Sequence, residues 1–132
     1  MNLTRLLRNA LAASLVLAAI HGPARAAASD YEFQLTQVEI PQGDALIAVR
    51  LIDKRSGEVV SDAVIFATRL DMAPDGMETM TTKIEPLPAS EPGIYRFKAN
   101  LSMEGGWRLS LAAKVQGEPE TVQSELTLKA LP

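Results

Sequence analysis

The sequence contains no cysteine and a single histidine, His21, and each scarcity excludes a class of chemistry. Without cysteine the chain forms no disulfide, no thiolate zinc site and no cysteine nucleophile. Because His21 lies in an N-terminal segment that we predict to be removed, the mature chain also lacks an imidazole. That excludes a Ser-His-Asp triad and the usual nitrogen ligands of metals. We therefore expect a protein that is not an enzyme.

The N-terminus has the three parts of a secretory signal peptide. Residues 1–8 are basic, residues 11–20 form a short apolar run, and Ala24-Arg25-Ala26 fits the small-x-small cleavage rule. The apolar run is about half of the ~20 residues that a membrane span needs, which favours cleavage over the alternative of a retained anchor helix. We expect a signal peptide at residues 1–26, a mature domain at residues 27–132 and a periplasmic or secreted location.

Removal of this segment makes the protein more acidic. The full chain has 13 Lys+Arg and 16 Asp+Glu, a net charge of −3. Residues 1–26 hold Arg5, Arg8 and Arg25 and no acidic residue, so 10 basic and 16 acidic residues remain, a net charge of −6. An acidic surface disfavours nucleic acid and anionic lipid as partners, but it is compatible with a cation.

Turn residues interrupt the mature sequence about every ten positions, which is typical of a β-sandwich. The expected strands are 31–38, 45–52, 63–70, 79–84, 94–101, 107–115 and 121–129. Alternation of apolar and polar residues is clearest in the later strands, where Trp107 and Leu109 alternate with Arg108. No segment after residue 28 has helical periodicity. These features predict an all-β, immunoglobulin-like antiparallel β-sandwich of about seven strands.

The sequence also predicts the roles of two aromatic residues and leaves the inward face of one strand open. Trp107, the only tryptophan, is expected to fill the core between the sheets. Tyr95 follows a Pro-Gly turn and is expected to bond through its hydroxyl to the backbone, as a corner tyrosine does. In 63–70, alternation leaves open whether Phe66 or Ile65 faces inward.

The methionines are concentrated in one part of the chain. Apart from the initiator they are Met72, Met77, Met80 and Met103. Methionine used as a core filler would be scattered, whereas these residues lie in sequence rich in Asp, Pro and Gly. The Asp-Gly pair at 75–76 can reverse the chain and bring Met72 and Met77 face to face. Because thioether sulfur selects soft ions, we predict a site for Cu(I), or for Ag(I), at these four residues.

Other roles for these methionines stay open. Met80 alternates with threonines and fits a core position, and Met103 fits a sulfur–aromatic contact with Trp107. The group also fits a flexible apolar surface that grips a protein partner. Carboxylates in the same segments would draw cations: Asp71, Asp75, Glu78 and Glu104.

Three motifs of the chain resemble the YtkA-like domain family. They are Asp71-Met72-x4-Met77-x2-Met80, Pro92-Gly93-Ile94-Tyr95-Arg96-Phe97 and Leu101-Ser102-Met103-Glu104-Gly105-Gly106-Trp107-Arg108-Leu109. The related FixH proteins carry similar Pro-Gly-x-Tyr and Met-x-Gly-x-Trp patterns. The resemblance covers residues 30–130, and its second half is the specific part.

The resemblance implies an exported or membrane-tethered immunoglobulin-like domain associated with copper handling. Such domains occur beside, or fused to, periplasmic adaptor subunits of heavy-metal efflux pumps, and FixH-type members are linked to cytochrome oxidase assembly. This chain departs from the pattern in two ways. Its loop lacks the histidine that often accompanies methionine, which disfavours Cu(II). Its N-terminus also looks cleavable, whereas FixH proteins are membrane-anchored, which disfavours oxidase assembly.

The sequence therefore predicts an exported Cu(I)- or Ag(I)-binding protein involved in copper handling or in delivery to an efflux system. An efflux-pump adaptor or an oxidase assembly protein is the expected partner, and no stable membrane insertion is expected once the signal is cleaved. The alternative is a metal-free interaction module or a FixH-like assembly factor of the cell envelope.

Overall fold

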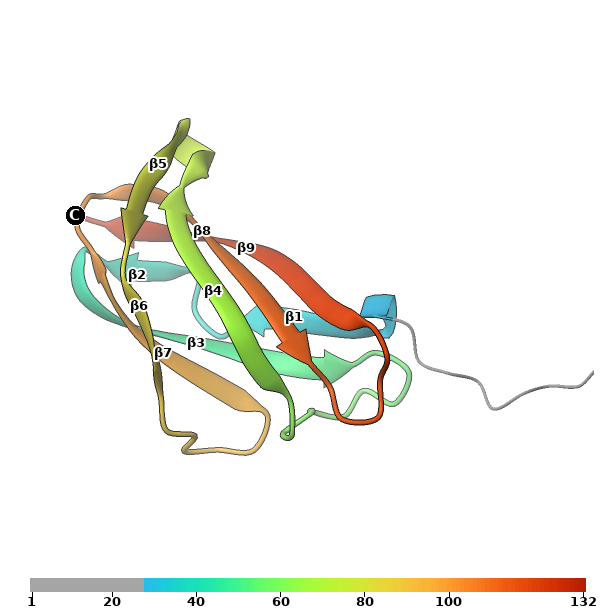
Figure 1. Cartoon of the computed structure of the whole chain (residues 1–132). Helices are drawn as coiled ribbons and strands as arrows, with labels where there is room; N and C mark the ends of the chain where they lie inside the picture. Colours follow the sequence, from blue (N-terminus) through green and yellow to red (C-terminus); the bar gives the residue numbers. More distant parts are fainter. Residues whose placement is uncertain (1–27) are drawn as a thin grey trace, which may run out of the picture.

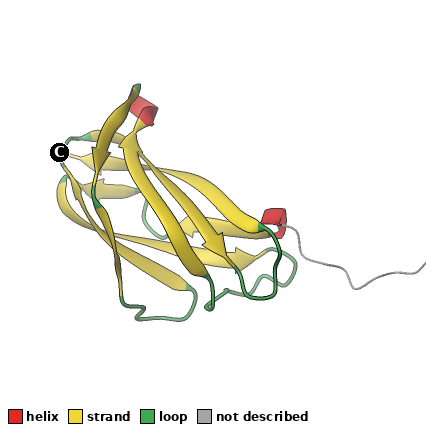
Figure 2. Ribbon diagram, in the orientation of Figure 1, coloured by secondary structure: helices red, strands yellow, loops and turns green. Residues whose placement is uncertain are grey.

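Residues 28–132 form two β-sheets packed face to face in a computed structural model (Figures 1 and 2). The expected signal peptide lies outside these described residues. Within them the helical elements are two single turns of 3-10 helix, η1 at Ala28–Asp30 and η2 at Ala73–Asp75. No helix between residues 28 and 132 has the length and apolar character to cross a membrane.

The two sheets contain nine strands. One sheet has the order β1-β3-β7-β6, with β1 at Tyr31–Leu35, β3 at Gly43–Asp53, β7 at Ile94–Leu101 and β6 at Ile84–Leu87. The other has the order β2-β9-β8-β4-β5, with β2 at Glu39–Pro41, β9 at Thr121–Leu131, β8 at Gly105–Lys114, β4 at Val64–Met72 and β5 at Met77–Thr82. All neighbours are antiparallel except β2 and β9, which are parallel. The expected all-β, immunoglobulin-like sandwich is confirmed.

The expected number of seven strands is wrong because the prediction omitted β2 and joined β5 and β6 into one strand. The expected strand 31–38 ends early, at Leu35, and the chain then enters the other sheet as β2. Tyr31 and Phe33 face inward, so continued alternation would direct Gln37 into the core. Leaving the sheet avoids this burial and places Ile40 inward instead.

The expected strand 79–84 is divided between the two sheets. β5 belongs to the five-stranded sheet, and after Lys83 the chain continues as β6 at the edge of the four-stranded sheet (Figure 1). The half-buried positions Met80, Thr82 and Ile84 keep the same alternation across the division. Because the period does not change, the sequence pattern contains no sign of the change of sheet.

The core lies between the sheets, and Trp107 is its largest fully buried side chain, as expected. The indole N–H of Trp107 donates a hydrogen bond to the backbone carbonyl of Met103 at 3.0 Å. The polar atom of the ring is therefore satisfied although the ring is buried. The structure thus joins the Trp107 side chain to the Met103 backbone.

A β-bulge resolves the ambiguous alternation of β4. Its register against β8 shifts between Ile65 and Ala67. Leu70 is fully buried on the far side of the bulge, whereas Val64 and Phe66 are 63% and 56% exposed. The extra residue thus changes which positions face inward within a single strand.

Tyrosine hydroxyls join segments at the end of the sandwich away from the β4–β5 hairpin. The Tyr95 hydroxyl donates to the carbonyl of Val60 at 2.8 Å and accepts from the N–H of Ala63 at 3.1 Å, which confirms the expected bonding to backbone. Burial raises the pKa of Tyr95. The Tyr31 hydroxyl donates to the Glu118 carboxylate at 2.8 Å.

Candidate functional site

Met72 and Met77 lie opposite each other in a hairpin formed by β4, η2 and β5. Met72 is the last residue of β4, Met77 is the first of β5, and their Cα atoms are register partners. Gly76 ends η2 with φ at +74°, a left-handed conformation that glycine adopts without a steric penalty. The expected reversal therefore occurs, over residues 73–76, and it pairs the backbone of Met72 with that of Met77.

The four methionines differ in exposure. Met72 is fully buried, Met77 and Met103 are each 37% exposed, and Met80 is partly buried against the core. The expectation that Met72 lies in loop-like sequence outside the core is wrong, because β4 continues two residues beyond the expected end at residue 70. Met72 follows Leu70 by two positions and so shares its inward-facing side.

Asp71 lies beneath the hairpin as a fully buried carboxylate. Its Oδ2 accepts hydrogen bonds from Arg69 Nε and Arg108 Nη2, both at 2.9 Å, and its Oδ1 accepts from the N–H of Ala73 at 2.9 Å. Burial, the largest single effect, raises the pKa of this carboxyl group. The hydrogen bonds from Arg108, Arg69 and Ala73 together outweigh burial and hold the pKa below its ordinary value.

Arg69 extends this network to the other strand of the hairpin. Its Nη2 donates to the carbonyl of Glu78 in β5 at 2.8 Å, while its Nε donates to Asp71 in β4. Together Asp71 and Arg69 join the residue that starts η2 to a residue of β5. The hairpin that carries Met72 and Met77 is therefore closed at its base by charge-assisted hydrogen bonds.

A second carboxylate joins the tip of the hairpin to β8. Asp75 Oδ2 accepts a hydrogen bond from the N–H of Gly106 at 3.1 Å. A Cβ atom added at Gly106 would lie 2.8 Å from Pro74 Cβ, and one added at Gly105 would clash with the Asp75 carboxylate and lie 3.2 Å from Met72 Cε. The two glycines thus let η2 lie directly on the start of β8.

This packing brings three of the four predicted residues to one end of the sandwich. Met72 and Met77 belong to the hairpin, and the Met72 methyl group lies against Gly105, two residues after Met103. Met80 instead packs against the core from β5. Within residues 28–132, no three His, Cys, Asp or Glu side chains come close enough to hold a metal ion. The candidate donors at this end are therefore thioethers.

The carboxylates of this region have different roles. Asp71 and Asp75 accept hydrogen bonds from groups of the protein, so they organise the hairpin. Glu78 and Glu104 are exposed. The sequence analysis did not predict that Asp71 belongs to a buried network. The one sign of it in the sequence was the presence of charged residues, Arg69 and Asp71 in one apolar strand and Arg108 in another.

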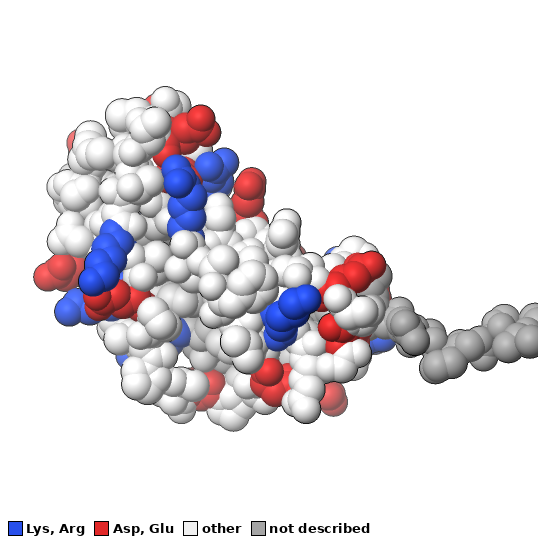
Figure 3. Space-filling view, viewed as in Figure 1, with Lys and Arg blue, Asp and Glu red and all other residues white. Residues whose placement is uncertain are grey.

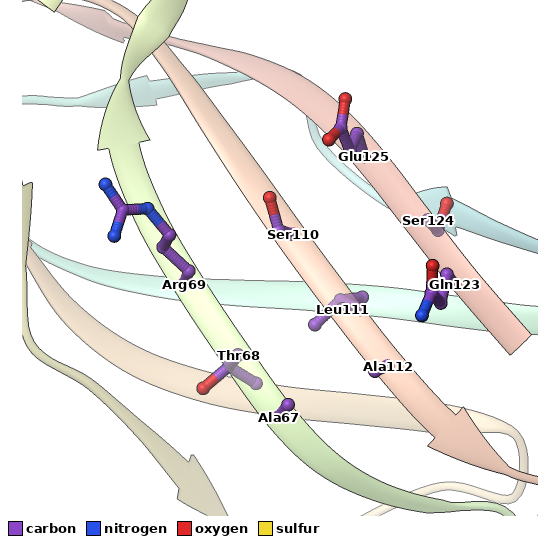
Figure 4. A pocket seen from close by; sticks show the side chains of 9 residues that line it. All are labelled: Ala67, Thr68, Arg69, Ser110, Leu111, Ala112, Gln123, Ser124 and Glu125. Atoms are coloured by element: carbon purple, nitrogen blue, oxygen red, sulfur yellow. The ribbon is translucent and has the colours of Figure 1, made fainter. Parts of the chain in front are cut away.

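A groove of about 540 Å³ lies elsewhere, on the outer face of β4, β8 and β9. Ser110 lies in it between the longer side chains of Arg69 and Glu125, and the small residues Ala67 and Ala112 lie further along β4 and β8 (Figure 4). A smaller, more apolar groove of about 290 Å³ lies between β4 and β6 and is lined by Phe66, Leu87 and Phe97, among others. No methionine lines either groove.

Charge does not single out either groove. On the face shown in Figure 3, basic and acidic side chains occur in small groups separated by uncharged surface. The end of the molecule where the hairpin lies carries both acidic and basic groups beside uncharged surface in this view.

The strand order and the paired methionines define an immunoglobulin-like β-sandwich with a methionine hairpin at one end. The chain belongs to the YtkA-like family, whose profile matches residues 25–112. The matched segment includes the hairpin, Met103 and Trp107. A search of curated proteins finds no match.

Several solved structures resemble this chain. The filamin domain of Lin-41 is 21% identical, with a TM-score of 0.46, and the alignment covers 82% of this chain and 98% of that domain. The C-terminal domain of ZirS is 12% identical, with a TM-score of 0.46 and coverage of 84% and 72%. A conjugative transposon lipoprotein from Bacteroides eggerthii is 12% identical, with a TM-score of 0.34 and coverage of 75% and 96%.

Proposed function

We propose that this protein is exported and binds Cu(I) or Ag(I) as cargo, which it carries or delivers to an efflux system. The observation that carries the proposal is the direct pairing of Met72 with Met77, next to the turn that contains Met103. Two or three thioethers satisfy a soft ion with a low coordination number. In this proposal the protein binds and releases metal and catalyses no reaction.

The different exposures of the three methionines fit a carrier. Met72 is buried, so it can contribute a ligand shielded from water, whereas Met77 and Met103 are partly exposed and accessible to a recipient. Neither histidine nor cysteine occurs in residues 27–132, so the affinity should be modest. Modest affinity permits transfer by ligand exchange to an efflux adaptor or to an oxidase assembly protein, the recipients proposed here.

The test is titration of the mature chain with Cu(I) under anaerobic, reducing conditions. We expect the double variant Met72→Leu/Met77→Leu to bind at least about tenfold more weakly, since both paired thioethers are lost. Leucine is close to methionine in volume, so the fold should be retained. Met80→Leu is the matched control and should bind as the wild type does. Unchanged affinity in the double variant would refute the proposal.

The exposed apolar residues of β4 favour a second candidate function, a metal-free interaction module in the cell envelope. Val64 and Phe66 are exposed beside the groove between β4 and β6. In this part of β4 the register pairs Val64 to Arg69 with β8 alone, and β5 pairs only with Leu70 to Met72. An extended segment of a partner, with apolar side chains for the groove, could add to the free edge.

A binding assay separates the two functions. If the protein is an interaction module, Phe66→Ser should abolish capture of an envelope partner, and Met72→Leu/Met77→Leu should leave capture unchanged with or without metal. If the protein is a metal carrier, Met72→Leu/Met77→Leu should weaken metal binding, and Phe66→Ser should leave metal binding unchanged.

A further inference from the structure

We propose that Asp75 is a positioning residue that holds the Met72–Met77 hairpin against the turn of Met103 and so completes a three-thioether site. This inference rests on the proposed function, because it assigns the third ligand of that site. Asp75 acts in this role through its hydrogen bond to the Gly106 N–H, and the metal is bound by the methionines.

The hydrogen bond occupies a distinctive place in the structure. Among the residues that the structure describes, Asp75 Oδ2 to Gly106 N, at 3.1 Å, is the one hydrogen bond that joins η2 to β8. The base of the hairpin is closed separately, through Asp71 and Arg69. Loss of the Asp75 bond should therefore release the tip of the hairpin while its base stays closed.

Packing around the bond shows that the two elements fit closely. Neither Gly105 nor Gly106 has room for a Cβ atom, because Pro74, Asp75 and the Met72 methyl group occupy that space. The φ angle of Gly105 is +127°, which also favours glycine. A backbone that approaches η2 so closely places Met103 within two residues of the Met72 methyl contact.

Loss of the Asp75 bond should affect the Met72–Met103 distance but not the pairing of Met72 with Met77. Met72 and Met77 are paired through the strand register of the hairpin, which does not depend on Asp75. Met103 belongs to the turn before β8, so its distance from Met72 depends on the packing of η2 on β8. Without the Asp75 bond, only a fraction of molecules should present all three thioethers together, and the apparent affinity should fall by that fraction.

Replacement of Asp75 by alanine and by asparagine separates positioning from charge. Asparagine keeps an acceptor oxygen for the Gly106 N–H but removes the charge, whereas alanine removes both. We expect Asp75→Ala to weaken Ag(I) binding about tenfold and Asp75→Asn to bind as the wild type does. Glu104→Gln is the matched control, because it removes an exposed charge from the neighbouring turn of Met103.

The readout is NMR of the mature chain with methyl-labelled methionines, titrated with Ag(I). In the wild type the methyl signals of Met72, Met77 and Met103 should shift together within one equivalent. In Asp75→Ala the Met103 signal should shift only at about tenfold higher Ag(I) concentration, while those of Met72 and Met77 still shift first. A Met103 signal that still shifts together with those of Met72 and Met77 in Asp75→Ala, or that is delayed equally in Asp75→Asn, would overturn the inference.

Measurements without metal distinguish failure of this inference from failure of the proposed function. If the wild type shows no response to Ag(I), the proposed metal function and with it the three-thioether site are wrong. The positioning role then stands or falls on the protection of the Gly106 amide from hydrogen exchange, which should be lost in Asp75→Ala and kept in Asp75→Asn. If Asp75→Ala does not fold, Gly106→Ala tests the same packing, because its added Cβ atom would meet Pro74.

Discussion

The two ends of the sandwich are joined by different chemical groups. At the hairpin end, the carboxylates of Asp71 and Asp75 accept hydrogen bonds from arginines and backbone N–H groups. At the opposite end, the phenol of Tyr95 both donates to and accepts from the backbone. A phenol stays neutral throughout the acidic and neutral range, whereas a carboxylate loses its charge in acid. The Asp71 network at the hairpin end should therefore respond to acid more strongly than the contacts of Tyr95 do.

The largest difference between the two ends should come from removal of Asp71. Asp71→Ala leaves the partly buried Ala73 N–H and the partly buried Arg108 without their acceptor. We expect the free energy of unfolding to fall by about 3 kcal/mol, the lower end for a broken buried ion pair, because Arg69 is half exposed. Urea denaturation measures this quantity. A loss below about 1 kcal/mol would show that the network contributes little.

Acid should weaken the hairpin end selectively. Because the pKa of Asp71 is lowered from 3.8 in the folded protein, its ionised form contributes stability that is fully present above that value. The contribution is lost as the pH falls below 3.8 and through the folded-state pKa. Hydrogen exchange at several acidic pH values should show the amides of Ala73 and β5 losing protection before those near Tyr95. Equal loss at both ends would contradict the comparison.

The smallest of these effects is expected at the tyrosine end. Tyr95→Phe removes the hydroxyl that bonds to Val60 and Ala63 and should cost about 2 kcal/mol, since two neutral hydrogen bonds of about 1 kcal/mol each are lost. The loss should not depend on pH below neutrality, in contrast to that of Asp71→Ala. Thermal unfolding of the two variants at two acidic pH values checks this. A pH-dependent loss in Tyr95→Phe would remove the distinction between the ends.

Local sequence patterns predicted much of the fold. The strand expected at 94–101 has those same bounds in β7, and Trp107 fills the core as its apolar neighbours suggested. The change of sheet at Lys83 could not be predicted, because alternation continues through it. The bulge at Phe66 likewise depends on the register with β8, which no single strand reveals.

The candidate site was predicted only in part, because some of its contacts are local in sequence and others join distant strands. The reversal at 75–76 is local, so the pairing of Met72 with Met77 could be inferred from sequence. The Asp71 network depends on Arg108, which is 37 positions away along the chain and adjacent only once β4 and β8 pair. The requirement for Gly105 and Gly106 likewise follows from the packing of η2, and the sequence alone suggested only a turn.

The bond between the Trp107 indole and the Met103 carbonyl gives the protein a built-in optical reporter. Trp107 is the only tryptophan in the chain, so its fluorescence comes from one known place. The ring is fully buried, and its single polar atom is bound to the turn that holds a proposed metal ligand. A ligand that moves this turn should therefore change the wavelength or intensity of emission, and binding can be followed in the unlabelled protein.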